Sequence, residues 1–184
     1  MHPRRIVMKK LFSVLICILS ISALNAPAFG WATSEGSVYA KGNMLGSAGL
    51  SIYPLGVLAG FDYGLHDCIS AGLAAGYNNS SWAPQVRTHQ VPIMARVAFH
   101  PFNLKVLSDK IVIRNMIDVY AGLNTGWIFR WYSSDLGIQS PDDASYFGLR
   151  EYIGMRYFVN DKLAIFVEDN NYLSYIGFGV TYKF

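Results

Sequence analysis

The side chains that could carry out chemistry are few, and they lie far apart along the chain. After residue 30 the histidines are His66, His89 and His100, and a hydrolase needs a nucleophile, a base and an orienting group in one site. In a membrane esterase His89 would be the base, and its candidate partners are Ser80, Ser81, Ser133 and Asp135. Because serine and aspartate are also common turn residues, the sequence favours a protein without catalysis. A lipid-modifying enzyme stays an alternative.

Metal, cofactor and nucleic-acid sites are not expected. No spacing of His, Cys, Asp or Glu is typical of a metal site, and no glycine-rich loop opens a helix as a phosphate-binding loop does. The two cysteines, Cys17 and Cys68, are too few for a disulfide framework. The formal net charge is only +3, and no cluster of Lys and Arg follows the first ten residues, which argues against nucleic-acid binding.

Residues 1–28 are expected to be a cleaved signal peptide. Lys9 and Lys10 precede an apolar run over residues 11–24, and Ala26-Pro27-Ala28 forms a small-x-small cleavage site. The apolar run is shorter than the roughly 20 residues that span a bilayer. This leader carries four of the basic residues and Cys17, so the exported chain would have a net charge of −1 and one cysteine. Met8 is an alternative start.

The hydrophobic pattern after residue 30 has a period of two, which is the period of β-strands. Segments in which apolar residues alternate with small or polar ones are 69–78, 91–100, 117–131, 152–159 and 175–184. A soluble lipocalin-like binding barrel would bury the apolar face, whereas an outer-membrane barrel would turn it towards lipid. The other face is rich in glycine and alanine, which make room for bulky neighbours inside a narrow barrel. Aromatic residues near strand ends also resemble interfacial girdles, so the membrane barrel is favoured.

The sequence therefore predicts an all-β fold, an eight-stranded antiparallel up-and-down transmembrane β-barrel over residues 43–184, after a short periplasmic segment 29–42. The expected strands are 43–53, 56–64, 68–78, 90–100, 115–131, 146–159, 162–169 and 172–184. An even number of strands leaves both chain ends on the periplasmic side, and the polar links 79–89 and 133–145 then lie outside the cell. The link 101–114 would be periplasmic although it is long and partly apolar, and the flanking strands are candidates to extend into it.

Alternation directs eight charged side chains towards the lumen. They are Asp62, Arg96, Asp118, Arg130, Arg150, Arg156, Glu168 and Lys183. Eight strands enclose an interior that side chains just fill, and buried charges must be paired or hydrated. We therefore expect an ionic network that closes the lumen. A narrow pore with a slight preference for anions is the alternative.

The outer loops contain aromatic residues beside polar ones. Trp82, Trp131 and Tyr132 are the candidates for contact with lipopolysaccharide, a host surface or a ligand. The alternative is that these side chains only anchor the strands at the membrane interface.

Several short pieces of the sequence carry a family resemblance. They are Lys41-Gly42 and the stretches 61–65, 69–72, 118–123, 154–158 and 179–184. In order and spacing they resemble the small OmpA-like outer-membrane β-barrel proteins of Gram-negative bacteria, over nearly all of the chain after the leader. The resemblance implies location in the outer membrane, with lipid and lipopolysaccharide as partners, and no shared chemistry. Tyr182 and Phe184 resemble the terminal signal that the outer-membrane assembly machinery reads, and we expect a monomer.

Overall fold

The structure, a computed structural model, describes residues 32–83, 86–134, 144–170 and 173–184. The expected signal peptide 1–28 and the loop residue Asp135 lie outside the described residues. In the described part of the chain, no helix is long and apolar enough to cross a membrane.

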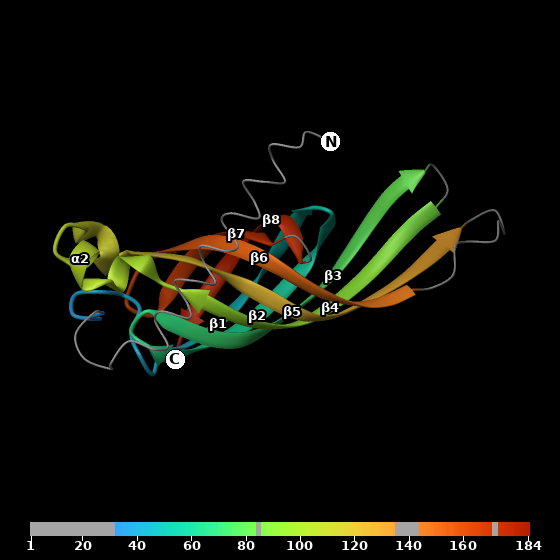
Figure 1. The fold of residues 1–184 in the computed structure, drawn as a ribbon. Helices are drawn as coiled ribbons and strands as arrows, with labels where there is room; N and C mark the ends of the chain where they lie inside the picture. The colour runs from blue at the N-terminus through green and yellow to red at the C-terminus, as the bar shows by residue number, and fades with distance from the viewer. Residues whose placement is uncertain (1–31, 84–85, 135–143, 171–172) are drawn as a thin grey trace, which may run out of the picture. The chain divides into compact units, whose positions relative to one another are not determined.

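The described residues form eight β-strands that pair in chain order, each antiparallel to its neighbours, and β1 pairs with β8 to close a barrel (Figure 1). The strands are β1 (Met44–Tyr53), β2 (Leu55–His66), β3 (Ile69–Ala83), β4 (Val86–Phe99), β5 (Ile117–Ser134), β6 (Ala144–Phe158), β7 (Leu163–Asn170) and β8 (Ser174–Lys183). The predicted eight-stranded antiparallel up-and-down barrel is confirmed. The N–H of Phe184 donates to the carbonyl of Met44 (3.0 Å), so β1 begins where β8 ends. We call this the terminal end of the barrel and the opposite end the loop end.

Side chains alternate between the two faces of the barrel wall, as the pleat of a strand requires. In β7 every second residue is buried and the residues between are exposed. Large apolar side chains are exposed on the outward face of every strand, with Leu73 at 64% and Ile93 at 53%. The interior holds charged and amide side chains together with apolar ones such as Met94 and Ile128. The barrel is thus apolar outside, and its buried charges lie inside.

Two inward glycines make room for the tyrosine rings that fill the interior. A Cβ atom at Gly154 would lie 2.7 Å from Cε2 of Tyr120, and one at Gly122 would lie 2.7 Å from Cε1 of Tyr152. Both distances are shorter than real Cβ contacts. The glycine-rich inner faces seen in the sequence therefore have a packing role in the narrow barrel.

At the loop end, β3 to β6 continue beyond the closed part of the barrel (Figure 1). The β6–β7 pairing stops at Tyr152 and Asn170, whereas the β5–β6 pairing continues to Arg130 and Ala144. The prediction of a loop over 79–89 is wrong for most of its length, because β3 runs to Ala83 and β4 starts at Val86. Most residues there are polar, which suits a sheet beyond the apolar band, so composition alone did not distinguish this strand pair from a loop.

At the terminal end, the link between β4 and β5 forms three short helical turns. They are η1 (Pro101–Asn103), α2 (Lys105–Ser108) and η2 (Val112–Asn115). The prediction that the flanking strands extend into this link is wrong. Pro101 lacks an N–H for the strand ladder and occupies the first helical position of η1 instead.

Candidate functional site

A network of buried ion pairs crosses the barrel between β2, β4 and β6. The guanidinium of Arg96 binds both carboxylate oxygens of Asp62, with Nε donating to Oδ1 at 2.6 Å. Arg156 joins two carboxylates, since Nη2 donates to Asp62 Oδ2 (2.6 Å) and Nη1 donates to Asp118 Oδ2 (3.1 Å). All four side chains are at most 4% exposed. Bidentate pairs of this kind are strong, and each buried charge has a partner.

Glu168 of β7 extends this network to the opposite wall. Its Oε2 accepts from Arg96 Nη1 (3.3 Å) and from the hydroxyl of Tyr120 (2.9 Å). Its Oε1 accepts from Nδ2 of Asn170 (3.0 Å). The guanidinium of Arg156 lies over the Tyr120 ring, with Cζ 4.1 Å from the ring centroid. Side chains of five strands thus meet inside the barrel.

His100 links the network to the terminal end. Its Nδ1 lies 2.6 Å from Asp118 Oδ1, and its Nε2 lies 3.0 Å from the hydroxyl of Ser70. The ring of Tyr39 stacks on the His100 ring at a centroid distance of 3.6 Å. The network holds three carboxylates, from Asp62, Asp118 and Glu168, and two guanidinium groups, from Arg96 and Arg156. His100 was not predicted to join the ionic network, because the sequence suggested only a catalytic role for a histidine.

The structure brings Asp62, Arg96, Asp118, Arg156 and Glu168 together but not the other three charged side chains expected in the lumen. Arg130 donates to the hydroxyl of Tyr146 (2.8 Å) near the loop end. Lys183 donates to the Val38 carbonyl (3.2 Å) at the terminal end. Arg150 is exposed and lies in the part of β6 beyond β7. It is six residues from Arg156, which is about 20 Å along a strand. Alternation fixes the face of a side chain but not its height along the barrel.

The N-terminal segment 32–43 covers the terminal end of the lumen. The Tyr39 ring is 1% exposed, and its hydroxyl donates to the carbonyl of Ile69 (2.8 Å). Asn103 of η1 donates from Nδ2 to the Tyr39 carbonyl (2.9 Å). Arg114 of η2 donates to the carbonyls of Thr33 (3.2 Å) and Glu35. The segment and the helical turns therefore form one cap, and the sequence shows no periodic signal for it.

Two groups near this cap have raised pKa values. Burial raises the pKa of the Cys68 thiol to about 12, with a smaller contribution from the charge of Asp67. Burial also raises the pKa of the Tyr39 hydroxyl, followed by the negative charges of Asp118 and Asp62. Both groups are therefore neutral at physiological pH, and Cys68 is a buried free cysteine.

The outward face near the loop end carries a cluster around His89. Its Nε2 lies 3.0 Å from the hydroxyl of Ser133, and its Nδ1 lies 2.7 Å from the hydroxyl of Tyr77. The His89 ring stacks on Trp131 at a centroid distance of 5.4 Å. The structure thus places Ser133, one of the serines proposed from the sequence, beside the histidine. A tyrosine hydroxyl occupies the position expected for an acidic residue.

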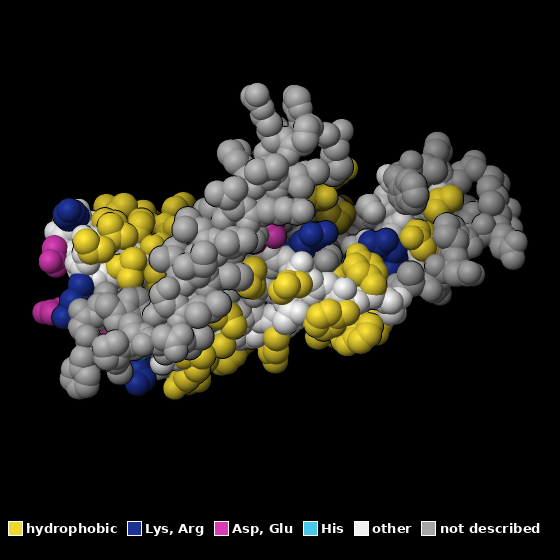
Figure 2. Space-filling view, viewed as in Figure 1, with side chains coloured by type: hydrophobic (Ala, Val, Ile, Leu, Met, Phe, Trp, Pro, Cys, Tyr) yellow, Lys and Arg dark blue, Asp and Glu magenta, His cyan; other side chains and the backbone are white. Residues whose placement is uncertain are grey.

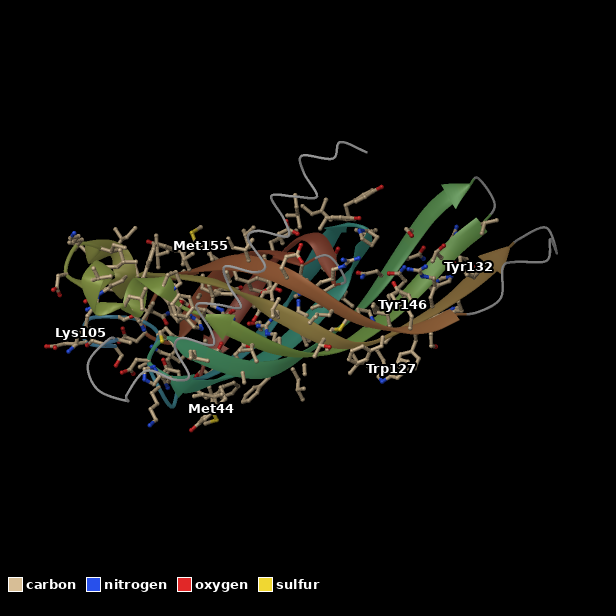
Figure 3. The ribbon with its side chains drawn as sticks, viewed as in Figure 1. Met44, Lys105, Trp127, Tyr132, Tyr146 and Met155 are labelled. Atoms are coloured by element: carbon tan, nitrogen blue, oxygen red, sulfur yellow. The ribbon has the colours of Figure 1, made fainter. Side chains whose placement is uncertain are left out.

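The remaining residues singled out from the sequence do not form a single cluster in the described part of the chain. Tyr132 is half-buried and lies on the face of the sheet opposite Trp127 (Figure 3). Because Trp131 lies on the same face as Trp127, Tyr132 does not contact Trp131 across the sheet. The Trp82 side chain lies outside the described residues. At the terminal end, Tyr182 and Phe184 pack edge to face at 5.1 Å and point outward with 42% and 68% exposure. Among the described residues, no group of three or more His, Cys, Asp or Glu side chains is arranged to hold a metal ion.

Comparison with known proteins identifies the fold. No family model and no curated relative matches the sequence. Among solved structures, the outer membrane protein OprG from Pseudomonas aeruginosa is similar at a TM-score of 0.55 and 12% identity, covering 81% of this chain and 98% of OprG. The Ail protein of Yersinia pestis is similar at a TM-score of 0.46 and 13% identity, covering 78% of this chain and 99% of Ail. The chain therefore has the fold of an eight-stranded antiparallel β-barrel similar to that of OprG.

Proposed function

We propose that this protein is an integral outer-membrane β-barrel with a structural or surface-interaction role. The observation that carries the proposal is the inverted distribution of side chains: the outward faces of all strands expose large apolar residues, and the ionic network lies inside. A soluble lipocalin-like barrel would place an apolar cavity where this chain has buried charges. The apolar outer surface requires lipid as its surroundings.

The closed lumen supports a structural role rather than conduction. Arg96, Arg156 and Tyr120 cross the interior and are almost completely buried. A permeating ion would have to separate ion pairs in a region of low dielectric constant, which costs several kcal/mol for each unpaired charge, on the order of 3–5. We therefore favour a closed barrel over the narrow pore with anion preference.

The orientation and partners follow from the same proposal. The terminal end, where β1 begins and β8 ends, would face the periplasm, and the extended β3–β6 sheet would face the outside. Residues 1–28 would direct export and be removed, and Tyr182 and Phe184 would be read by the outer-membrane assembly machinery. Outer-membrane lipid and lipopolysaccharide would surround a monomer.

Cell fractionation tests this location. With the full chain expressed in a Gram-negative host, we expect the protein in the outer-membrane fraction, shortened by its leader. A tag inserted within residues 135–143, between β5 and β6, should be accessible to protease on intact cells, and a tag after Phe184 should be protected. Recovery in the soluble periplasmic fraction would refute the proposal.

A lipid-modifying enzyme is the second candidate, favoured only by the contact between Ser133 and His89. In such an enzyme the Ser133 oxygen attacks the acyl carbon of a lipid ester, and its proton passes to Nε2 of His89 and then to the leaving alkoxide. Water then hydrolyses the acyl-serine. Mass spectrometry of lipid A from cells with the protein or its Ser133→Ala variant tests this candidate. Identical lipid A in both, and in cells without the protein, would exclude activity on lipid A.

A further inference from the structure

The terminal end carries a cluster of exposed apolar side chains that the closed barrel does not explain. It lies in and around the helical turns between β4 and β5, at the end of the molecule where Figure 1 shows α2. Its members are Val106, Val112, Ile113 and Met116, with exposures of 69%, 82%, 53% and 41%. Valine and isoleucine side chains are usually buried in folded proteins, so this degree of exposure is unusual. We call residues 105–116 the helical link.

This apolar surface is continuous with the outward face of the barrel. The carbonyl of Met116 accepts from the N–H of Phe158 in β6 (2.7 Å), and the N–H of Met116 donates to the carbonyl of Ile113 (2.9 Å). Next to Phe158, the outward side chains of Tyr157 and Val159 are 41% and 60% exposed. The exposed residues of the helical link therefore extend the band that the proposed function assigns to lipid.

Basic side chains accompany the apolar ones. Lys105 and Lys110 are exposed, with Asp109 between them, and Figure 3 shows Lys105 at the tip of the terminal end. Figure 2 shows hydrophobic side chains at this end of the molecule, with basic and acidic groups at its edge. Apolar side chains beside lysines are typical of segments that lie in the membrane interface, where the lysine stems lie along the acyl chains and the ammonium groups reach lipid phosphates.

We propose that the helical link is an interfacial anchor that binds the anionic phospholipid headgroups of the periplasmic leaflet. This proposal rests on the proposed outer-membrane location. Val112 and Ile113 enter the upper acyl region, and Lys105 and Lys110 contact lipid phosphates. The anchor holds the link against the membrane, and through Arg114 and Asn103 it holds the cap over the lumen.

A fluorescent probe that senses water tests the anchor. In a Cys17→Ser, Cys68→Ser background of the full chain, single cysteines replace Val112, the exposed Asn115 of the same η2 turn, or Ile93 in the barrel band, and each carries the probe. The proteins are reconstituted in phosphatidylcholine vesicles with or without phosphatidylglycerol. Nitroxide groups near the headgroup end of the acyl chains serve as quenchers.

We expect a blue-shifted probe at Val112 that the lipid nitroxides quench, and a water-exposed probe at Asn115. The quenching at Val112 should weaken without phosphatidylglycerol. Replacing Lys105 and Lys110 by glutamine should lower the ratio of membrane-bound to unbound helical link by roughly five-fold for each lysine.

The control at Ile93 distinguishes failure of the proposed anchor from failure of the proposed membrane barrel. Quenching at Ile93 without quenching at Val112 would overturn the anchor and leave the membrane barrel intact. No quenching at either position would refute the proposed function. A blue-shifted probe at Val112 that lipid nitroxides do not quench would also overturn the anchor, because a second copy or another protein would then cover the link.

Discussion

At the residue scale, the central feature is that each charged side chain of the buried network is stabilised by contacts with its partners. Arg156 is 1% exposed and contacts two carboxylates and the Tyr120 ring. Sequence alternation predicted that Arg156 and Asp62 face inward, because the face of a strand residue depends only on its parity. It did not predict that they meet, because the stagger between strands sets the height of each side chain. Arg150 has the same parity as Arg156 and lies about 20 Å away along β6.

Removal of Arg156 should destabilise the folded barrel strongly. The Arg156→Met variant removes the guanidinium that pairs with both Asp62 and Asp118, and breaking a buried pair costs about 3–5 kcal/mol. Arg130→Met near the loop end is the matched control, because half-buried Arg130 donates to the neutral Tyr146 hydroxyl, and loss of one such hydrogen bond costs about 1 kcal/mol. Urea unfolding in lipid vesicles measures both free energies. Equal losses in the free energy of unfolding for the two variants would show that Arg156 contributes no more to stability than Arg130 does.

Cys68 should be almost inert to thiol reagents in the folded protein. Its thiol is buried and its pKa is raised to about 12, and the thiolate is the reactive form. Alkylation at neutral pH should therefore be far slower for the folded protein than for the urea-unfolded protein. Comparable rates in the two states would contradict the burial of this side chain.

The raised pKa of Cys68 also predicts a loss of stability in alkali. Its value rises from 9.0 to about 12 on folding, so the folded state holds its proton where the unfolded state has released it. This contribution is fully present below pH 9, and it is lost as the pH rises from 9 to about 12. The Cys68→Ser variant should lose less stability over this interval. A parallel pH dependence of the two proteins would refute the assignment.

At the element scale, the strands were more predictable than the connections between them. A period of two over ten or more residues identifies a strand whatever its neighbours are, and β5 and β8 agree with the prediction to within a few residues. The cap has no such signal, because Tyr39, Asn103 and Arg114 are positioned by single hydrogen bonds to carbonyl groups. The strand extension at the loop end was hidden for a different reason, since polar strands and polar loops have the same composition.

Tyr39 should hold the cap in place. Its ring stacks on His100, and its hydroxyl donates to the Ile69 carbonyl, so the Tyr39→Ala variant removes both contacts. We expect faster proteolysis within residues 32–43 while the strands remain folded. Lys41→Ala, at an exposed position of the same segment, is the control. Unchanged proteolysis in the Tyr39→Ala variant would show that the cap is held by other contacts.

At the scale of the whole molecule, the barrel has an apolar outer surface and an interior crossed by buried ion pairs. This arrangement predicts a barrel that does not conduct ions. Purified protein added to planar lipid bilayers should give no single-channel steps at any moderate voltage. Regular conductance steps that disappear when the protein is omitted would contradict a closed lumen and favour the narrow pore.

The most direct test of the membrane barrel is the mobility of the detergent-solubilised protein on a dodecyl sulfate gel, with and without prior heating. A closed membrane barrel keeps its compact form in the detergent until heated, so we expect the unheated protein to migrate faster than the heated protein. We also expect the folded protein to precipitate when detergent is removed without lipid, because its outer surface is apolar on every strand. A folded protein that stays in solution without detergent would contradict the membrane barrel.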